Sequence, residues 1–222
     1  IPTGTKYDSG DYHAVLDKVL DFANYEGLIA RRDEIRAQGR LAGIGIATCL
    51  EPSGGNNVFE YLMNPAAEIT TFMEGCQIQV SADGRITSQM GTTTSGQGHE
   101  TLVATIIGEE LQRDPSEVRV VHVDSLAGIP TRSPVASRMA VMLGGAAAGA
   151  AQKIKEQILA IAAHNLARST IDLEYSGGCV FDRSDPSRKL DWAELCFIAH
   201  RQFHRLPPDQ EPGLQAMHVW QV

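Results

Sequence analysis

The sequence predicts an α+β fold in which mixed sheets pack against helices. Three observations support this. Segments with the two-residue alternation of strands are interleaved with segments of helical period. An Asp-Gly pair marks a tight turn between two of the strands. One helical segment runs for about 30 residues. The chain has 222 residues, 43% hydrophobic and 21% charged, so it can bury a substantial core.

The N-terminal part predicts two helices followed by a strand. Residues 11–23 carry apolar side chains at helical spacing, and Asp8 or Ser9 is expected to cap the first turn. Residues 26–39 form an arginine-rich segment that ends at a glycine, as helices often do. Residues 41–50 follow as a strand whose small side chains allow close packing.

Three further strands are predicted at residues 67–73, 76–80 and 85–90, where apolar and polar side chains alternate. The last two flank residues 81–84, which contain the Asp-Gly pair. A hairpin is therefore expected there.

The middle of the chain alternates helices and strands. A helix follows a glycine-containing loop and ends near Arg113, a strand covers residues 118–123, and a loop covers 126–134. A long helix is then predicted over residues 137–167. Within it, residues 143–151 are almost all glycine or alanine, so another backbone or a ligand can approach closely.

The C-terminal part predicts a second hairpin, over residues 171–175 and 177–182, and a last helix over residues 190–203. Residues 217–222 are apolar and strand-like. The chain also starts without an initiator methionine, and both features suggest a segment cut from a longer polypeptide.

Composition excludes several classes of protein. A formal net charge of −8 argues against nucleic-acid binding, which would be expected to show a basic face. No apolar run approaches the ~18 residues of a membrane span. The four cysteines (Cys49, Cys76, Cys179 and Cys196) include no CxxC pair, which excludes the common zinc and iron–sulfur spacings within this chain. They are expected to be lone core thiols of a cytoplasmic protein in a reducing compartment.

The most informative segment is the loop of residues 91–98, which lies between a predicted strand and a predicted helix. Gly96 and Gly98 let the backbone pass close to a ligand, and the N–H groups at the helix start form an anion site. Gln97, which follows Ser95 and Gly96, offers both a donor and an acceptor at the mouth of that site. The alternative is a tight turn whose glycines only satisfy backbone geometry.

A second loop of the same kind covers residues 131–138 and runs into the long helix. Ser133 or Ser137 can cap that helix, and Arg138 can meet a phosphate, although capping alone would account for the serines. Two such loops, each opening a helix, suggest one extended anionic ligand held between them.

Metal chemistry has weak support in this sequence. The pair His99-Glu100 lacks the second histidine that a zinc-protease helix requires, because Val103 stands there. A site built from His99, His122 and Asp124 would need fortunate folding, and His122 is better explained as a hydrogen-bonded histidine on a strand.

Acid–base chemistry has no better candidate. The adjacent acids Glu109-Glu110 and Asp33-Glu34 point apart on helices and are expected to be solvated. His200 and His204 have metal-binding spacing but are expected at the surface.

An ordered series of segments extends over nearly the whole chain. The series comprises residues 7–11 (YDSGD), 40–45 (RLAGIG), 96–101 (GQGHET), 118–124 (VRVVHVD) and 137–138 (SR) ahead of the glycine/alanine-rich helix. In this series the chain resembles the molybdopterin-binding large subunit of the xanthine dehydrogenase and aldehyde oxidase family. It looks most like the bacterial branch with aerobic carbon monoxide dehydrogenase and nicotinate dehydrogenase.

The resemblance implies a molybdenum cofactor-binding domain-like fold, with residues 1–222 forming part of the molybdopterin-binding domain of a longer large subunit. It implies a role in a molybdenum hydroxylase that oxidises an aldehyde or an N-heterocycle with water, electrons leaving through iron–sulfur clusters to a flavin. The implied partners are the remainder of the large subunit, the FAD-binding and iron–sulfur subunits and a small-molecule substrate.

The implied cofactor is molybdopterin, in this branch as the cytosine dinucleotide. Its pyrophosphate suits the two helix starts. The resemblance assigns cofactor contacts to both loops. The residues so assigned are Ser95, Gly96, Gln97, Gly98, Thr131, Ser133, Val135, Ala136 and Ser137.

Two departures from the family pattern bear on activity. Ser95 stands where relatives often have a larger residue, and residues 131–136 differ from the glycine-rich loop of the carbon monoxide branch, so carbon monoxide is not the expected substrate. The family's metal-activating carboxylate lies in a later segment that is not recognised here, and a hydroxylase needs such a base. The chain alone is therefore expected to be inactive and to retain no tightly bound cofactor. The alternative is a non-catalytic phosphate- or nucleotide-binding module on the same scaffold.

Overall fold

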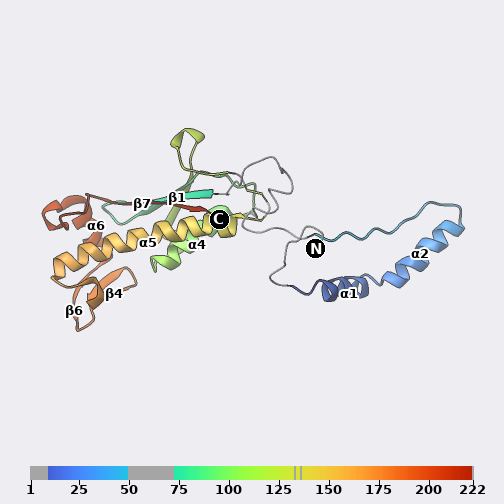
Figure 1. The fold of residues 1–222 in the computed structure, drawn as a ribbon, viewed down its shortest axis with the longest axis horizontal. Helices are drawn as coiled ribbons and strands as arrows, with labels where there is room; N and C mark the ends of the chain where they lie inside the picture. Colours follow the sequence, from blue (N-terminus) through green and yellow to red (C-terminus); the bar gives the residue numbers. More distant parts are fainter. Residues whose placement is uncertain (1–9, 50–72, 133, 136, 222) are drawn as a thin grey trace. The chain divides into compact units, whose positions relative to one another are not determined.

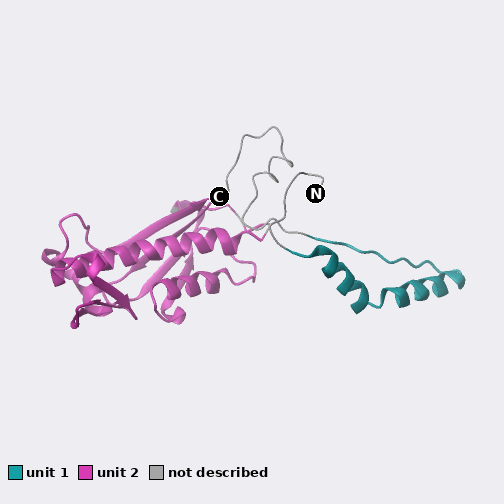
Figure 2. Cartoon of the chain, turned by 60° about the horizontal axis from the view of Figure 1, so that its bottom comes forward, with its two compact units in different colours: residues 1–51 teal, residues 52–222 magenta. Residues whose placement is uncertain are grey.

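The computed structural model describes residues 10–49, 73–132, 134–135 and 137–221 (Figure 1). The chain divides into two compact units, residues 1–51 and residues 52–222 (Figure 2). Within the described ranges, no helix is long and apolar enough to cross a bilayer.

The first unit contains two helices, α1 (Tyr12–Phe22) and α2 (Tyr25–Ala37), as predicted. The cap of α1 is Asp11, whose side chain accepts from Ala14 N, so the expectation of Asp8 or Ser9 is wrong. None of the described residues of this unit is buried. Residues 41–49 form no strand, because they have no strand among the described residues to pair with.

The second unit is built on a four-stranded mixed sheet in the order β3–β2–β1–β7. Its strands are β1 (Met73–Val80), β2 (Ile86–Met90), β3 (Val118–His122) and β7 (Leu214–Gln221). β1 pairs antiparallel with both β2 and β7, whereas β2 and β3 run parallel. The strand predicted at residues 67–73 lies outside the described residues except for Met73, the first residue of β1.

The predicted hairpin between β1 and β2 is confirmed. Ser81 N donates to Arg85 O, and Gly84 takes a φ of +83°, which favours glycine. The indole N–H of Trp192 donates to Gly84 O at 2.8 Å, so the turn is tied to a distant helix.

Two helices pack against this sheet. α4 (His99–Glu110) connects the parallel strands β2 and β3. The long predicted helix is α5 (Met139–Leu166), which lies against β1 and β7 (Figure 1). Its small residues allow the close approach that the sequence suggested: a Cβ on Gly145 would lie 2.6 Å from the Trp220 ring, and one on Gly149 would lie 2.2 Å from the His218 ring.

A small antiparallel sheet in the order β4–β5–β6 follows α5. It contains the predicted hairpin of β4 (Leu173–Ser176) and β5 (Cys179–Asp182) and a third strand, β6 (Asp185–Leu190), that the sequence analysis missed. β6 was not predicted because its residues are polar and mostly exposed and show no apolar alternation.

The last helix is α6 (Trp192–Arg201). Short 3₁₀ turns are η1 (Pro115–Glu117), η2 (Ser125–Ala127), η3 (Thr170–Asp172) and η4 (Phe203–Arg205).

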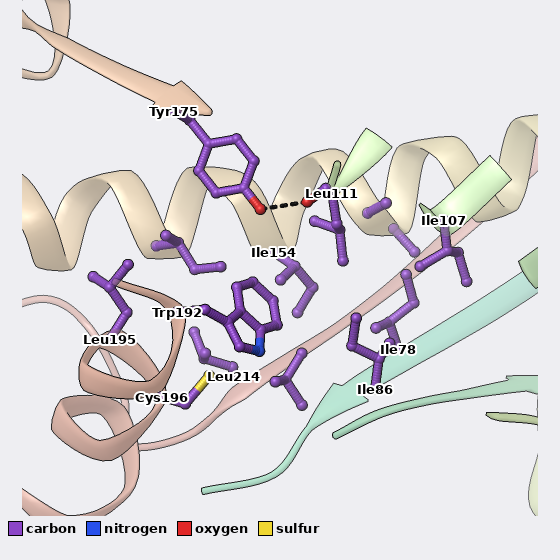
Figure 3. Packing of buried hydrophobic residues seen from close by; sticks show 14 of the residues in the cluster. Ile78, Ile86, Ile107, Leu111, Ile154, Tyr175, Trp192, Leu195, Cys196 and Leu214 are labelled. Carbon is purple, nitrogen blue, oxygen red and sulfur yellow. Dashed lines mark hydrogen bonds between the residues drawn. The ribbon is translucent and has the colours of Figure 1, made fainter. Parts of the chain in front are cut away.

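One apolar core joins these layers (Figure 3). Ile78, Ile107 and Ile154 bring the sheet, α4 and α5 together, and all three are fully buried. The Tyr175 hydroxyl crosses the core to donate to Leu111 O at 2.6 Å, and burial raises the pKa of this hydroxyl to about 12. The small sheet is therefore fixed to the end of α4.

The cysteines are free thiols, as expected, but only two of the four lie in the core. Cys76 and Cys196 are buried, and burial raises the pKa of their thiols to about 11 and about 12. They behave as small apolar core residues. Cys179 is partly buried and Cys49 is exposed.

Candidate functional site

The two loops singled out in the sequence open on one cavity of about 520 Å³. The lining residues come from the glycine loop and first turn of α4 and from the segment leading into α5. These residues are Gln97, Gly98, His99, Leu102, Pro134, Val135, Ser137, Arg138, Met139 and Ala140. The fold therefore brings together the starts of two helices that are far apart in the chain.

The first wall of the cavity is the glycine loop. Gly96 and Gly98 have φ values of +104° and +77°, which side-chain-bearing residues rarely adopt. A Cβ at either position would meet nothing within 4 Å, so the space beside them is open. Gly98 is the N-cap of α4 and no side chain caps this helix. The N–H of Glu100 meets the carboxylate of the same residue, and the other N–H groups of the first turn are left for a ligand.

The side-chain carbonyl oxygen of Gln97 accepts two hydrogen bonds from within this loop. Its Oε1 accepts from Ser95 N at 2.5 Å and from Thr94 Oγ1 at 3.1 Å. The expectation that Gln97 offers both a donor and an acceptor is therefore corrected, because the carbonyl oxygen is engaged within the loop. The amide NH₂ remains as its donor to a ligand.

The second wall leads into α5. Arg138 is the N-cap of α5 and makes no capping side-chain bond, and Ser137 has a φ of +52°, so the predicted serine cap at Ser137 is wrong. Ser133 lies outside the described residues. Like α4, α5 therefore begins at the cavity, and none of the described side chains caps its N-terminus.

Arg138 forms a buried ion pair with Glu74, which differs from its predicted role. Its guanidinium donates to Glu74 Oε1 at 2.6 Å and to Met73 O at 3.2 Å, and both Glu74 and Arg138 are fully buried. The expectation that Arg138 meets a phosphate is therefore corrected, because its charge is already matched inside the protein.

Glu74, which the sequence analysis missed, anchors the second loop. Besides Arg138, its carboxylate accepts from Thr131 Oγ1 at 2.6 Å and from Arg132 N at 3.0 Å. The signal that was available is alternation, since Glu74 shares the buried face of β1 with Cys76. An acid on that face requires a buried cation, and Arg138 stands directly before an apolar helix.

Glycines hold the second loop against the ends of the strands. Gly75 N donates to Pro130 O at 2.6 Å. A Cβ on Gly91 would lie 2.8 Å from Ile129 O and 2.9 Å from Thr131 Cγ2. These contacts leave no room for a side chain, and they fix one loop relative to the other.

The side chain of His122 connects strand β3 to the glycine loop and to the first turn of α4. His122 on β3 bonds Thr92 O through Nδ1 at 2.9 Å and Glu100 Oε1 through Nε2 at 2.6 Å, as expected of a hydrogen-bonded strand histidine. The Thr92 carbonyl and the ionised Glu100 carboxylate are both acceptors, so both bonds are complete only when both ring nitrogens carry a proton. The Thr92 carbonyl and then the Glu100 carboxylate raise the pKa of His122, and the pKa of Glu100 is lowered by its own backbone N–H and by His122.

His99, the first residue of α4, is a polar residue of the cavity wall with an unsatisfied hydrogen-bonding atom. It is 5% exposed, and its Nδ1 is buried without a hydrogen-bond partner among the described residues. An orphaned nitrogen, two uncapped helix starts and open space at two glycines together fit an anionic, oxygen-rich ligand.

The nine predicted contact residues divide into three groups. Those that line the cavity are Gln97, Gly98, Val135 and Ser137. Ser95, Gly96 and Thr131 belong to the same loops but do not line it, and the Thr131 hydroxyl is taken by Glu74. Ser133 and Ala136 lie outside the described residues. Their assignment to a cofactor stays a prediction.

Comparison with known proteins gives this geometry a context. The sequence profile of a family described as the molybdopterin cofactor-binding domain matches residues 18–222. The chain is 34% identical over 220 residues to the carbon monoxide dehydrogenase large chain of Hydrogenophaga pseudoflava, covering 98% of this chain and 26% of that protein. It is 26% identical over 219 residues to the nicotine 6-hydroxylase large subunit of Paenarthrobacter nicotinovorans, covering 99% and 26%.

Solved structures agree with the sequence comparison. Quinoline 2-oxidoreductase from Pseudomonas putida 86 matches with a TM-score of 0.72 at 26% identity, covering 98% of this chain and 27% of that chain. The predicted α+β fold is confirmed. The chain spans about a quarter of the length of the curated relatives it matches.

Proposed function

The chain belongs to the molybdopterin cofactor-binding domain family, within the xanthine dehydrogenase and aldehyde oxidase group, and we propose that its cavity holds the phosphorylated part of the cofactor. The observation that carries this proposal is the convergence of two uncapped helix starts on one cavity. Each helix N-terminus carries a partial positive charge and unpaired N–H groups, which together favour a phosphate.

The residues that would hold the cofactor come from both loops. Gln97 would donate from its amide, and Gly98, Val135 and Ser137 would present backbone and hydroxyl groups along the cavity. A pyrophosphate has enough oxygens to meet both helix starts, which supports a dinucleotide form of the cofactor, and we propose the cytosine dinucleotide from the family resemblance. Ser95, Gly96, Thr131, Ser133 and Ala136 would shape the same two loops.

The bound cofactor supplies the redox chemistry of the intact enzyme. The residues of this chain bind and orient it. The described residues supply no evident catalytic base: the carboxylate of Glu74 is bonded to Arg138, and that of Glu100 to His122. We therefore propose that the chain is inactive alone and that another part of the large subunit provides the base.

For the whole enzyme we propose hydroxylation of an aldehyde or an N-heterocycle with water. Two of the similar proteins carry N-heterocycles in their names, nicotine and quinoline. We propose the remainder of the large subunit and FAD-binding and iron–sulfur subunits as partners. The non-catalytic alternative finds no support among these relatives.

The experiment that tests this proposal compares two glycine variants in the full-length large subunit assembled with its partners. Gly98→Ala places a Cβ on the cavity wall. Gly128→Ala is the control, because Gly128 has a similar φ of +72° and open space but does not line the cavity. Metal analysis should give about one molybdenum per wild-type large subunit and severalfold less for Gly98→Ala, with Gly128→Ala close to wild type.

Absence of molybdenum from the wild-type assembly would overturn the proposal. Equal molybdenum content in all three proteins would show that the glycine loop is not part of the cofactor-binding site. The isolated 222-residue chain is expected to show no turnover.

A further inference from the structure

The larger sheet has an open edge at strand β7. This strand of eight residues is the end strand of the order β3–β2–β1–β7, and it lies beside β1 (Figure 1). No strand in the described part of the chain pairs with its other side. Such an edge presents a row of unpaired N–H and C=O groups, which proteins usually cover or pair.

Alternate residues of β7 direct their backbone groups toward this open edge. In an antiparallel ladder, a residue either exchanges both backbone bonds with its partner or turns both groups away from it. Val219 is in register with Gly75, but Gly75 N donates to Pro130 O instead. The N–H and C=O of Val219 therefore face the open edge, and by alternation so do those of Met217 and Gln215.

Side chains of α5 cover the first part of this edge. Lys153 Nζ donates to Met217 O at 2.9 Å, and Gln157 Nε2 donates to Gln215 O at 2.9 Å. Charged side chains on an edge are a common means of preventing a further strand from pairing. Four positions before Lys153, the same side of α5 carries Gly149, which has no side chain to reach the strand. The cover therefore stops before the last residues of β7.

The uncovered part of the edge consists of residues 219–221, here called the open half of β7. The backbone groups that Val219 turns outward have no partner among the described residues. The neighbouring Trp220 is 41% exposed. Unpaired backbone groups beside an exposed aromatic side chain favour pairing with a further strand.

The lengths of the relatives indicate the source of that strand. The chain spans about a quarter of the curated relatives it matches, so the greater part of those large subunits lies outside the matched segment. A strand of the same polypeptide is held near β7 at a high effective concentration, whereas a second molecule must be captured from solution.

We propose that the open half of β7 receives a strand from the remainder of the large subunit, which extends the four-stranded sheet by one strand. The inference rests on the proposed function, because it takes the chain as part of a longer large subunit. The added strand bonds the N–H and C=O of Val219 and covers Trp220.

Hydrogen exchange at single residues of β7 tests the added strand. The 222-residue chain is compared with the full-length large subunit assembled with its partners. We expect the amides of Val219 and Gln221 to exchange rapidly in the 222-residue chain and at least about tenfold more slowly in the assembly. Slow exchange at two residues that lie two positions apart is the signature of a paired strand. The amide of His218, which faces β1, should exchange slowly in both proteins.

Two proline variants of the 222-residue chain test the direction of the backbone groups. Val219→Pro removes an N–H that β1 does not use, so its Tm should fall by no more than about 3 °C. His218→Pro is the matched control, because it removes an N–H that bonds to β1, and its Tm should fall by roughly 10 °C. Equal effects of the two prolines would overturn the assignment of the open edge.

The remaining outcomes separate this inference from the proposed function. Rapid exchange of Val219 in an assembly with about one molybdenum per large subunit would overturn the added strand alone. Slow exchange of Val219 in the monomeric 222-residue chain would show that the edge is covered within that chain, and slow exchange with a dimeric mass in light scattering would assign the edge to a second copy. Both results contradict the proposal. Absence of molybdenum from the assembly would overturn the proposed function, whatever the exchange shows.

Discussion

At the scale of single residues, the ring of His122 ties three pieces of the site together. It joins strand β3 to Thr92 in the glycine loop and to Glu100 in the first turn of α4. Since both partners accept, the contact is complete only while the ring carries its second proton. The order of the glycine loop therefore depends on pH.

The sign of this dependence follows from the two pKa shifts. The pKa of His122 is raised above its ordinary 6.5, so its contribution to stability is fully present below about 6.5 and is lost as the pH rises through the raised value. The pKa of Glu100 is lowered from 4.5, so its contribution is present above about 4.5 and is lost as the pH falls through the lowered value.

We expect wild-type protein to lose stability relative to a His122→Gln variant as the pH rises from about 6 to 9, because glutamine keeps a donor that does not titrate. Urea unfolding of both proteins across this range measures the difference. Parallel pH profiles for the two proteins would contradict the assignment.

At the scale of elements, the path of α5 along β7 is set by its small residues. His218 and Trp220 rings lie directly against Gly149 and Gly145. The glycines therefore serve the packing of strand on helix, at some cost in helix propensity.

Alanine substitutions at two glycines of α5 test this packing. Gly149→Ala should destabilise the fold by about 1–3 kcal/mol, because its Cβ would overlap the His218 ring and outweigh the gain in propensity of ~1 kcal/mol. Gly144→Ala is the matched control, since its Cβ would meet only the mobile end of Ile106 at 3.0 Å. It should be neutral or slightly stabilising. Chemical denaturation measures both, and equal effects would refute the packing argument.

Elements with strong local patterns were predictable, and those that depend on partners were not. α5, the β1–β2 hairpin and β7 follow from period and turn residues. The strand predicted at residues 41–50 has the right composition but no pairing partner in the described chain, and β6 has a partner but no apolar pattern.

The candidate site shows the same limit. Both loops were found from glycines and hydroxyls before helices, and the structure brings them to one cavity. Glu74 was missed and Arg138 was assigned to a ligand, because their pairing joins residues 64 positions apart. Long-range pairs of this kind leave no local periodicity in a sequence.

At the scale of the whole molecule, the two units differ in how they are stabilised. The second has a continuous core, whereas the described residues of the first include none that is buried, and Val15, Val19 and Phe22 are exposed. Helices of 11 and 13 residues are marginal in water without tertiary packing.

Hydrogen exchange of the isolated chain should therefore separate the units. We expect amides of α1 and α2 to exchange rapidly and those in the middle of α5 to exchange only through large-scale unfolding. Mass spectrometry of peptides from the three helices measures this. Comparable protection in α1 and α5 would show that the first unit is stabilised by more than its own helices.

The anchoring of the second loop by Glu74 also bears on the order of events during folding. The loop reaches its place only when β1 has met residues 57 to 64 positions further along the chain. Contacts of such separation form late, because the entropy of closing the intervening chain must be overcome first. The second wall of the cavity is therefore incomplete in any partly folded chain in which β1 has not yet met this segment, and we expect such a chain to bind the cofactor poorly.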